Sequence, residues 1–439
     1  MESRIKRTFL DPQQFIRRSL DMKDDSVPVE RACLGEGFEN QKTKRTQKII
    51  WPPTYLMLRT VIISAYYAEI IMHYIHQLKS WPKFEWDRKG LAEPLAAVRL
   101  EQGRLLGRME HLGFPLQQEA LLLILTEDVL KSSEIEGEKL NEETVRSSIA
   151  RRLGMDIGGL ETIGRNVEGV VEMMLDATRH YDEPLTAERL FGWHASLFPT
   201  GRSGMKRITV GAWRDDAEGP MQVVSGPLGR QHVHFKAPAA KLLNREMEAF
   251  LAWFHASDEK DWVVKSSLAH LWFVTIHPFD DRNGRIARAI ADMSLARSEK
   301  SSQRYYSMSA QIRRERRAYY DHLEQAQRGA LDITNWMEWF LNCLGRAIDG
   351  AQTTLATVLA KARFWDSIAT VTLNERQRLM LNRLRDSFEG KLTTSKWAKL
   401  AKCSQDTATR DINALVSEGV LKRNAVGGRS TSYSIVMPS

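Results

Sequence analysis

Residues 277–288 combine the side-chain types that phosphate chemistry requires. The stretch contains one histidine, two carboxylates, an amide, a glycine and three arginines. His277 can accept a proton near neutral pH, a carboxylate can hold magnesium, and a loop that opens a helix presents free backbone N–H groups to an anion. Arg285 and Arg288 are three residues apart, so both side chains can flank the same anion. The stretch therefore indicates a phosphate-binding site that includes a general base.

Two apolar segments must position this loop. Residues 261–276 carry apolar side chains in a pattern typical of a buried helix, and a second apolar helix is predicted to start near Ile286. A purely structural cluster of ions is the alternative explanation of the loop. Such a cluster would not require an Asn283-Gly284 pair at that place.

The loop resembles the signature of Fic proteins, which reads His, any residue, Phe, any residue, an acid, Gly, Asn, Gly, Arg or Lys, two of any residue, and Arg. Seven of the eight specified positions match in order, and Arg282 replaces the glycine at the sixth motif position. The family mostly transfers AMP from ATP to a protein hydroxyl, while some members remove AMP or move other phosphate-containing groups. The resemblance implies a mainly α fold, with a helical Fic core and a β-hairpin flap.

The resemblance also implies a role for each matching residue. His277 would be the general base that deprotonates a Ser, Thr or Tyr hydroxyl on a target protein. That hydroxyl would attack the α-phosphate of the substrate ATP, with Mg²⁺ held by Asp281. Phe279 would anchor the loop in the core. The phosphate-binding residues would be Asn283, Gly284, Arg285, Arg288 and the unusual Arg282.

Arg282 is the departure from the family pattern. The family glycine lets the backbone approach phosphate closely, and an arginine there needs a tolerable φ angle. Its charge could add phosphate binding, or its bulk could impair the anion site. We expect retained but altered activity, with an inactive core as the alternative.

A helix is predicted over about residues 115–137, and its last turn carries a second set of candidate residues. Gly137 suits a helix terminus, whereas Glu136 places negative charge at the unfavourable end of the helix dipole. A buried arginine partner would resolve that conflict. The stretch resembles the inhibitory signature of Fic proteins, Ser or Thr, three residues, Glu, then Gly or Asn, with Ser132 in first place. The resemblance implies that Glu136 pairs with Arg288 and blocks the ATP γ-phosphate.

Residues 201–238 predict a β-hairpin in an otherwise helical chain, because short alternating apolar runs flank a Gly- and Pro-containing turn. In Fic proteins the hairpin ahead of the motif is a flap that pins the target segment as an added strand. The target-binding residues implied here are Val223, Val224, His232, Val233 and His234. The two histidines share one strand face, but no third metal ligand is near in sequence, so we expect no metal there.

Pattern and composition divide the chain into four parts. The predicted division is an extension over 1–71, an N-terminal domain over 72–155, a Fic catalytic core over 156–369 and a winged helix-turn-helix over 370–439. The extension is read either as an over-extended gene start, with Met72 as the natural first residue, or as a divergent appendage, and we favour the first. Its uncharged apolar run is far shorter than the ~20 residues of a membrane span.

The C-terminal part carries most of the excess positive charge. Residues 371–439 hold twelve Lys and Arg against six Asp and Glu. Arg410, with Gln405 and Thr409, could face a DNA groove, and Arg429 would lie at the wing tip. A protein-interaction module is the alternative, supported by Asp406 and Asp411 on the same predicted helix.

Whole-chain composition narrows the function classes. The 439 residues carry a net charge of +8 and three widely spaced cysteines, which argues against a disulfide framework or a zinc site and suits a cytoplasmic protein. No P-loop, GxGxxG or HExxH motif is present. The leading prediction is a self-inhibited protein adenylyltransferase that uses ATP and Mg²⁺. The alternatives are an AMP-removing enzyme and a DNA- or partner-binding regulator; the target protein and a homodimeric state are left open.

Overall fold

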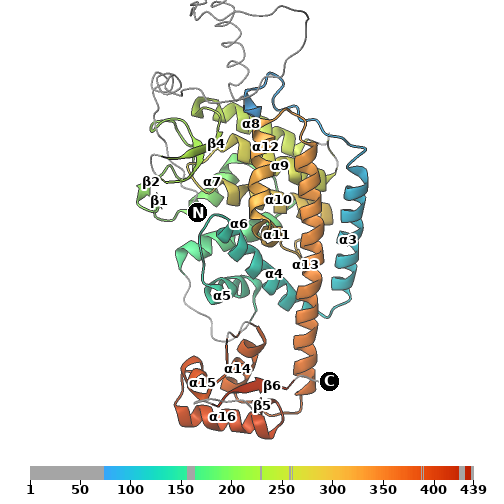
Figure 1. Ribbon diagram of the computed structural model, residues 1–439, viewed down its shortest axis with the longest axis vertical. Helices are drawn as coiled ribbons and strands as arrows, with labels where there is room; N and C mark the ends of the chain where they lie inside the picture. The colour runs from blue at the N-terminus through green and yellow to red at the C-terminus, as the bar shows by residue number, and fades with distance from the viewer. Residues whose placement is uncertain are drawn as a thin grey trace, which may run out of the picture.

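The computed structural model describes residues 74–155, 164–227, 230–256, 259, 261–386, 388, 390–424 and 431–436. Within these residues the chain is mainly α-helical, with small two-stranded sheets at its margins (Figure 1), which confirms the expected fold class. None of the described helices combines the length and the apolar character that crossing a membrane requires. The predicted extension over 1–71 and the predicted wing tip at Arg429 lie outside the described residues.

Two consecutive helices form the centre of the molecule. Helix α9 (Trp262–Ile276) starts at Asp261, whose carboxylate accepts the backbone N–H of Val263 and Val264. Every residue of α9 after Trp262 is buried, as its apolar sequence predicts. Helix α10 (Asn283–Glu299) packs along α9, and its first four turns are also largely buried. Because both helices are buried by neighbouring elements, the short loop between them is anchored at its first and at its last residue.

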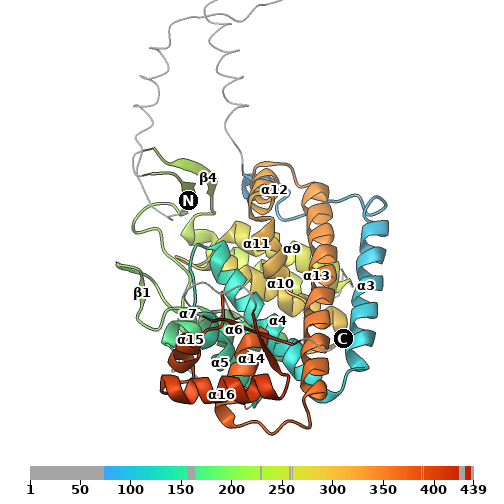
Figure 2. The same cartoon turned by 60° about the horizontal axis from the view of Figure 1, so that its bottom comes forward.

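A second layer of helices lies against this pair. Helix α4 (Phe114–Ile135) packs on α11 (Met308–Arg314) and on the long α13 (Thr334–Ser367), close to the predicted bounds of 115–137. Helix α3 (Ala92–Glu110) runs beside α13 (Figure 2). Helix α5 (Glu142–Leu153) follows α4 and is capped by Asn141, whose Oδ1 accepts the Thr144 N–H at 2.9 Å.

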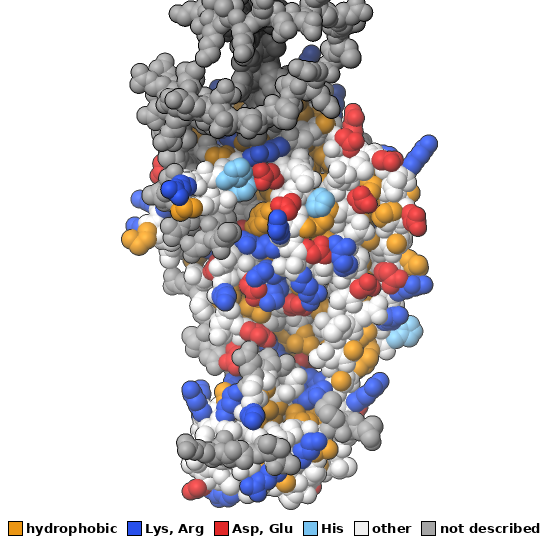
Figure 3. Space-filling view, in the orientation of Figure 1, with side chains coloured by type: hydrophobic (Ala, Val, Ile, Leu, Met, Phe, Trp, Pro, Cys, Tyr) orange, Lys and Arg blue, Asp and Glu red, His pale blue; other side chains and the backbone are white. Residues whose placement is uncertain are grey.

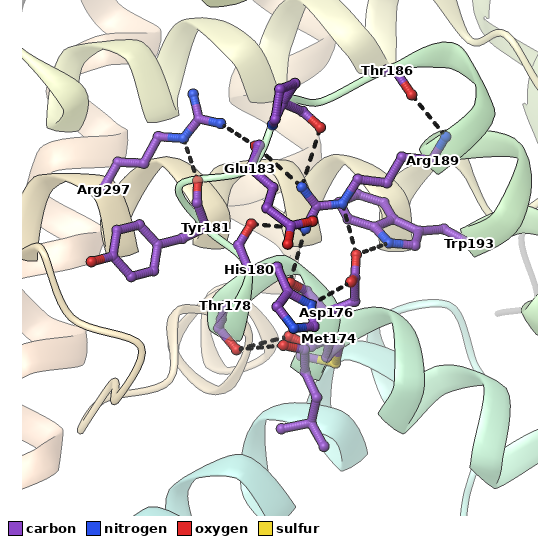
Figure 4. A network of polar contacts seen from close by, with 12 residues as sticks. Met174, Asp176, Thr178, His180, Tyr181, Glu183, Thr186, Arg189, Trp193 and Arg297 are labelled. Atoms are coloured by element: carbon purple, nitrogen blue, oxygen red, sulfur yellow. Dashed lines mark hydrogen bonds and ion pairs between the residues drawn. The ribbon is translucent and has the colours of Figure 1, made fainter.

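A polar network fixes the next pair of helices to α10 (Figure 4). The Asp176 carboxylate, on α6 (Arg165–Arg179), accepts Arg189 Nε at 2.8 Å and Trp193 Nε1 at 2.7 Å from α7 (Ala187–Leu197). Arg297 of α10 donates to the backbone carbonyls of Tyr181 and Glu183 in the α6–α7 connection. The remaining described helices before α13 are η1 (Ile75–Gln77), η2 (Ala240–Leu242), α8 (Leu243–His255) and α12 (Arg316–Arg328).

The predicted β-hairpin is present ahead of α9. Strands β3 (Gln222–Ser225) and β4 (His232–Lys236) pair antiparallel, with a bulge between Val223 and Val224. A smaller hairpin, β1 (Arg202–Ser203) with β2 (Lys206–Arg207), precedes it. Phe235 and Met221 form a separate small apolar cluster with Tyr74, so the base of the larger hairpin has its own core.

The C-terminal residues form a unit with a core distinct from the main one. Its elements are α14 (Glu375–Asp386), α15 (Thr394–Leu400), α16 (Gln405–Ser417), β5 (Leu421–Arg423) and β6 (Tyr433–Ile435). Trp397 is fully buried at the centre of this core, which begins at Phe364 near the end of α13. Thr393 caps α15, Ser404 caps α16, and Gly419 follows α16 at a φ of 71°. Figure 1 shows the unit below the helical body, reached through α13.

Candidate functional site

The motif loop begins and ends in a strained backbone conformation. His277 closes α9 with φ 52° and ψ 58°, and Arg282 opens α10 with φ 66° and ψ 14°. Both lie in the left-handed region, which costs a residue with a side chain about 1–2 kcal/mol. Strain of this kind persists only where the surroundings determine it, and it concentrates at functional sites. The positive φ at Arg282 also explains why the Fic signature has glycine at that position.

The bonding of His277 leaves one ring nitrogen available as a base. Its Nδ1 lies 3.1 Å from the Val274 carbonyl oxygen, which can only accept, so Nδ1 carries the proton and Nε2 is unprotonated. Nε2 is buried and makes no hydrogen bond within the described structure. Burial lowers the pKa of His277 to about 4, although the carbonyl of Val274 and the charges of Asp281 and Glu136 oppose that shift. The imidazole is therefore neutral at pH 7.

Two residues hold the shape of the loop. Phe279 is fully buried and stacks on the ring of His194, with centroids 4.2 Å apart, which matches the anchoring role predicted for it. The Asn283 side chain accepts the Phe279 N–H at 3.0 Å and donates Nδ2 to the Phe279 carbonyl at 2.8 Å. The Asn283 amide thus serves the loop itself. The predicted contact of Asn283 with phosphate would therefore use the second Nδ2 hydrogen or the backbone N–H of Asn283.

The two carboxylates of the loop point to neighbouring backbone and to the small hairpin. Asp280 accepts the Thr209 N–H at 2.9 Å. Asp281 accepts the Arg282 N–H at 2.7 Å through Oδ1 and the Ser203 hydroxyl through Oδ2. One carboxylate that is already oriented, together with substrate phosphates, is the kind of ligand set that Mg²⁺ prefers. Asp281 therefore fits the predicted Mg²⁺ ligand.

The arginines of α10 present buried donors at the start of the helix. The Arg285 side chain is 1% exposed, and its Nε and Nη1 have no partner within the described structure. Arg288 has one such nitrogen, Nη1. Burial and the nearby Arg282 charge lower the pKa of Arg285 to about 10, against the opposing charge of Glu138. Buried guanidinium donors without acceptors are costly in a folded protein, so this site fits an anion.

Glu136 lies against the same helix start. Its Oε1 accepts Arg288 Nη2 at 2.9 Å, and a Cβ atom placed on Gly284 would meet Oε1 at 2.4 Å. Ser132 completes the contact, because its hydroxyl and carbonyl oxygens accept Arg288 Nε at 3.0 Å and Nη2 at 2.9 Å. Gly137 follows at a φ of 83° and ends the turn. The carboxylate therefore lies in the position at the helix N-terminus that an anion would take.

Electrostatics explains how a carboxylate is tolerated at the end of α4. Burial alone would raise the pKa of Glu136, but the charges of Arg288 and Arg285 outweigh it and hold the pKa below its ordinary value. Arg316 Nε donates to the Ile135 carbonyl at 2.8 Å and covers the negative end of the helix. Arg288 is thus the buried arginine partner that the sequence analysis expected for Glu136.

Glu138 is a second carboxylate at this site, and the sequence analysis did not include it. Its Oε2 lies 2.6 Å from Arg282 Nη1 and 2.5 Å from Arg285 Nη2. Burial would raise its pKa, but the charges of Arg285 and Arg282 lower it. Three motif arginines are therefore paired with two acids from the turn after α4. Glu138 could not be found from spacing, because the residues it contacts are 144 and 147 positions away.

Arg214 is another residue that the sequence analysis missed. Its guanidinium is fully buried and donates to the His277 carbonyl at 2.8 Å and to the Pro238 carbonyl at 2.6 Å. Its backbone N–H donates to the Pro278 carbonyl at 2.9 Å. Because Pro238 lies two residues after the end of strand β4, Arg214 ties the base of the larger hairpin to the motif loop.

The residues predicted to bind a target lie on that hairpin. Val224 is buried and pairs with Val233, whereas Val223 and His234 are partly exposed and His232 is exposed. The hairpin carries exposed polar and half-buried apolar side chains on a two-stranded sheet. A further strand could be added along such a sheet by main-chain pairing.

Comparison with known proteins gives this site a family context. Residues 184–295 match the model of the Fic/DOC family, and residues 74–155 match the model of a domain of unknown function (DUF4172). The chain therefore contains a Fic/DOC domain, and that domain includes the motif loop. The predicted four-part division is not tested by these matches and stays a prediction.

Individual relatives are distant. A protein adenylyltransferase Fic of Nematostella vectensis is 33% identical over 122 residues, which are 27% of each chain. A uridine 5'-monophosphate transferase of Xanthomonas campestris pv. campestris (strain 8004) is 28% identical over 127 residues, 26% of this chain and 21% of the relative. The chain thus spans about a quarter of the length of these relatives. A solved Fic family protein from Desulfovibrio desulfuricans G20 shares 19% identity at a TM-score of 0.47, covering 80% of this chain and 98% of that chain.

Proposed function

We propose that this chain is a self-inhibited protein adenylyltransferase that moves AMP from ATP to a Ser, Thr or Tyr hydroxyl of a target protein. The observation that carries the proposal is the Glu136 carboxylate held by Arg288 against Gly284. A carboxylate in that place imitates a phosphate oxygen, and its removal would open a site built for phosphate.

The proposed chemistry uses the groups of the motif loop. Nε2 of His277 takes the proton of the target hydroxyl, whose oxygen then attacks the α-phosphorus of ATP. The bond from that phosphorus to the bridging oxygen of the β-phosphate breaks, and pyrophosphate leaves. Asp281 would hold Mg²⁺, which supplies neutralisation of the phosphate charge. Positioning and charge neutralisation supply most of the catalysis in displacements of this type.

Binding of the triphosphate would draw on the free donors at the start of α10. The backbone N–H groups of the first helical turn have no intrahelical acceptor, and the dipole favours negative charge there. Arg285 and Arg288 contribute the buried nitrogens that lack partners. Arg282, the residue in place of the family glycine, adds a third guanidinium at the edge of the same site.

The proposed inhibition has two parts. Glu136 competes with the γ-phosphate for Arg288, and Ser132 stabilises the closed arrangement. Glu138 neutralises the charges of Arg282 and Arg285 and occupies one nitrogen of each, so both arginines attract phosphate less strongly until the turn after α4 moves. The positive charge added by Arg282 is therefore balanced by an acid of the inhibitory turn.

The identity of the nucleotide rests on the relatives. The Nematostella relative is named for adenylyl transfer, whereas the Xanthomonas relative is named for transfer of uridine 5'-monophosphate. We propose ATP, and a parallel assay with UTP would test that choice.

The decisive experiment is transfer of label from α-labelled ATP with Mg²⁺ to the protein itself or to proteins of a cell extract. The variants are Glu136→Gly, the double variant Glu136→Gly with His277→Ala, and the control Glu134→Gly. Glu134 lies two residues before Glu136 and pairs with Lys131 and Arg313 instead of with the motif arginines. We expect at least ~10-fold stronger labelling in Glu136→Gly alone, since ~1.4 kcal/mol of relief corresponds to tenfold. A folded Glu136→Gly protein that transfers neither AMP nor UMP would overturn the proposal.

A second function is proposed for the C-terminal unit, namely DNA binding by a winged helix. Asp411 was one of two acidic residues that supported a protein-interaction module as the alternative. It is 5% exposed and pairs inside the unit with Arg376 at 3.0 Å. Gln405, Thr409 and Arg410 are exposed on α16. In the face shown in Figure 3, Lys and Arg outnumber Asp and Glu on this unit.

A further inference from the structure

A metal-binding set of side chains lies between the larger hairpin and helix α12. Within the described residues, His232, His234 and Glu324 are the one group of three such side chains whose ligand atoms all lie within 4.8 Å of one another. The two histidines are on β4 and Glu324 is on α12, 90 residues further along the chain from His234. The sequence analysis expected no metal for want of a third ligand, and the fold supplies one.

The contacts of His234 place its ring in a suitable orientation. Its Nδ1 lies 2.6 Å from Glu324 Oε2, and its Nε2 lies 2.6 Å from the Ser225 hydroxyl oxygen. Because a carboxylate only accepts, Nδ1–H donates to Glu324 without a bound ion, and Nε2 accepts from the Ser225 hydroxyl. A cation would displace the proton from Nδ1, after which Nε2–H can donate to the same hydroxyl. A hydrogen bond on the second ring nitrogen is the usual way in which a protein orients a metal-binding histidine.

His232 can complete the group by a small rotation. Its Nε2 lies 3.9 Å from Glu324 Oε1, and the centroids of the two imidazole rings are 4.6 Å apart. Ligands at ~2.0–2.1 Å from a tetrahedral zinc ion are roughly 3.3 Å from one another. The His232 side chain is 64% exposed, so it can turn by the required fraction of an ångström without disturbing the core.

The ligand types select the class of metal. Imidazole nitrogens suit zinc, copper and nickel, whereas magnesium prefers an all-oxygen set. The site would therefore discriminate against the Mg²⁺ that the transfer reaction requires. Arg328 is the opposing charge, since its Nη2 lies 3.1 Å from Glu324 Oε1. The ion would share Glu324 with Arg328, so binding should be weaker than in a closed structural zinc site.

We propose that His232 Nε2, His234 Nδ1 and the Glu324 carboxylate bind a zinc-class divalent ion, with water in the fourth position. Arg328 already donates to the carbonyls of Val233 and His234, so α12 is tied to the main chain of β4. Helix α12 lies beside β4 (Figure 1, Figure 2), and the ion would add a tie through the side chains of that strand. It would fasten the hairpin whose exposed strand is proposed to receive the target, and it does not depend on nucleotide transfer.

The test is zinc uptake by the full chain, measured by competition with a chromophoric zinc chelator after removal of bound metal. The variants are His232→Ala and Glu324→Gln, and the control is His111→Ala, another exposed histidine at the end of α3. We expect the wild type and His111→Ala to bind one zinc ion more tightly than His232→Ala does, by at least ~10-fold. Excess Mg²⁺ should not compete.

A second readout separates specific binding from attachment to other histidines. Hydrogen exchange of the β4 amides should slow with zinc in the wild type and in His111→Ala, but not in His232→Ala or Glu324→Gln, because an ion that binds the folded hairpin suppresses its opening. Equal zinc affinity in all four proteins would overturn the proposal. So would zinc binding with no change in β4 exchange in the wild type.

Discussion

Burial decides the chemistry of His277. A solvent-exposed histidine has a pKa of about 6.5, so about three quarters of such side chains would be protonated at pH 6. Desolvation places the pKa of His277 at about 4 instead. The ring thus stays neutral, and Nε2 stays a proton acceptor, across the range in which the protein would work. The Val274 carbonyl fixes which nitrogen that is.

The corresponding prediction concerns the pH profile of transfer. In Glu136→Gly we expect the rate at pH 6 to lie within about twofold of the rate at pH 7.5, because a base acts in its unprotonated form. The negative charge of Glu136 raises the pKa of His277. Its loss in Glu136→Gly therefore lowers that pKa and moves the acid limb of the profile to lower pH. Initial rates between pH 5 and 8 measure this. A half-maximal rate near pH 6.5 would show that His277 is not desolvated as described.

Arg282 allows a separate prediction about stability. Replacement by alanine or by glycine removes the same pairing with Glu138, but only alanine keeps the cost of a left-handed backbone. We therefore expect Arg282→Gly to be more stable than Arg282→Ala by about 1 kcal/mol. Urea unfolding of both variants and the wild type measures the difference. An alanine variant as stable as the glycine variant would argue against the φ of 66° at this position.

Residues close in sequence were predictable, and those joined only by the fold were not. The motif loop, the end of α4 and the cap at Asn141 follow from local patterns. Arg214 and Glu324 carry no local signal, since their contacts with His277 and His234 span 63 and 90 residues. The same holds for Glu138. Sequence reasoning located the residues proposed to do chemistry and missed several residues that contact or neutralise them.

At the scale of elements, the end of α4 acts as a clamp on α10. The Ser132 hydroxyl accepts a hydrogen bond from Arg288 Nε. In the next turn, Glu136 pairs with Arg288 and Glu138 pairs with Arg282. Ser133 is also fully buried, but its hydroxyl makes no hydrogen bond within the described structure. The two adjacent serines therefore offer a matched pair of substitutions.

We predict that Ser132→Ala raises basal AMP transfer and that Ser133→Ala does not. Loss of a hydrogen bond to a charged group weakens the closed arrangement by about 1.5–3 kcal/mol, which corresponds to roughly tenfold or more in transfer rate. The increase should be smaller than in Glu136→Gly, since the carboxylate remains. Initial rates with α-labelled ATP measure it. Equal rates in the two serine variants would mean that Ser132 does not support the clamp.

Element boundaries show where local reasoning stops. The helix predicted to start near Ile286 begins three residues earlier, at Asn283. The 3₁₀ turn Ala240–Leu242 directly precedes α8, and a periodic sequence pattern does not distinguish such a turn from the first turn of an α-helix. The capped starts of α15 at Thr393 and of α16 at Ser404 are boundaries that a sequence can indicate, since a cap is a local signal.

At the scale of the whole molecule, α13 links the clamp to the C-terminal unit. With 34 residues it is about 51 Å long and runs from the main core into the second one. Lys361 on its C-terminal half pairs with Glu119 of α4 at 2.6 Å. Arg383 of the C-terminal unit lies 3.7 Å from Glu143 of α5. Helix α4, which carries Ser132 and ends next to Glu136, thus has a direct contact with the helix that leads into the second unit.

The last prediction tests whether that unit meets DNA. We expect the full chain to bind a labelled DNA duplex with an affinity that falls steeply as salt rises, because released counterions drive such binding. Arg410→Glu should weaken it by about tenfold. Arg317→Glu is the control, since Arg317 is 97% exposed on α12 and its reversal changes net charge equally. Fluorescence anisotropy over a salt series measures both. Equal losses would indicate binding to overall charge, and absence of binding at low salt would leave the exposed face of α16 to a protein partner.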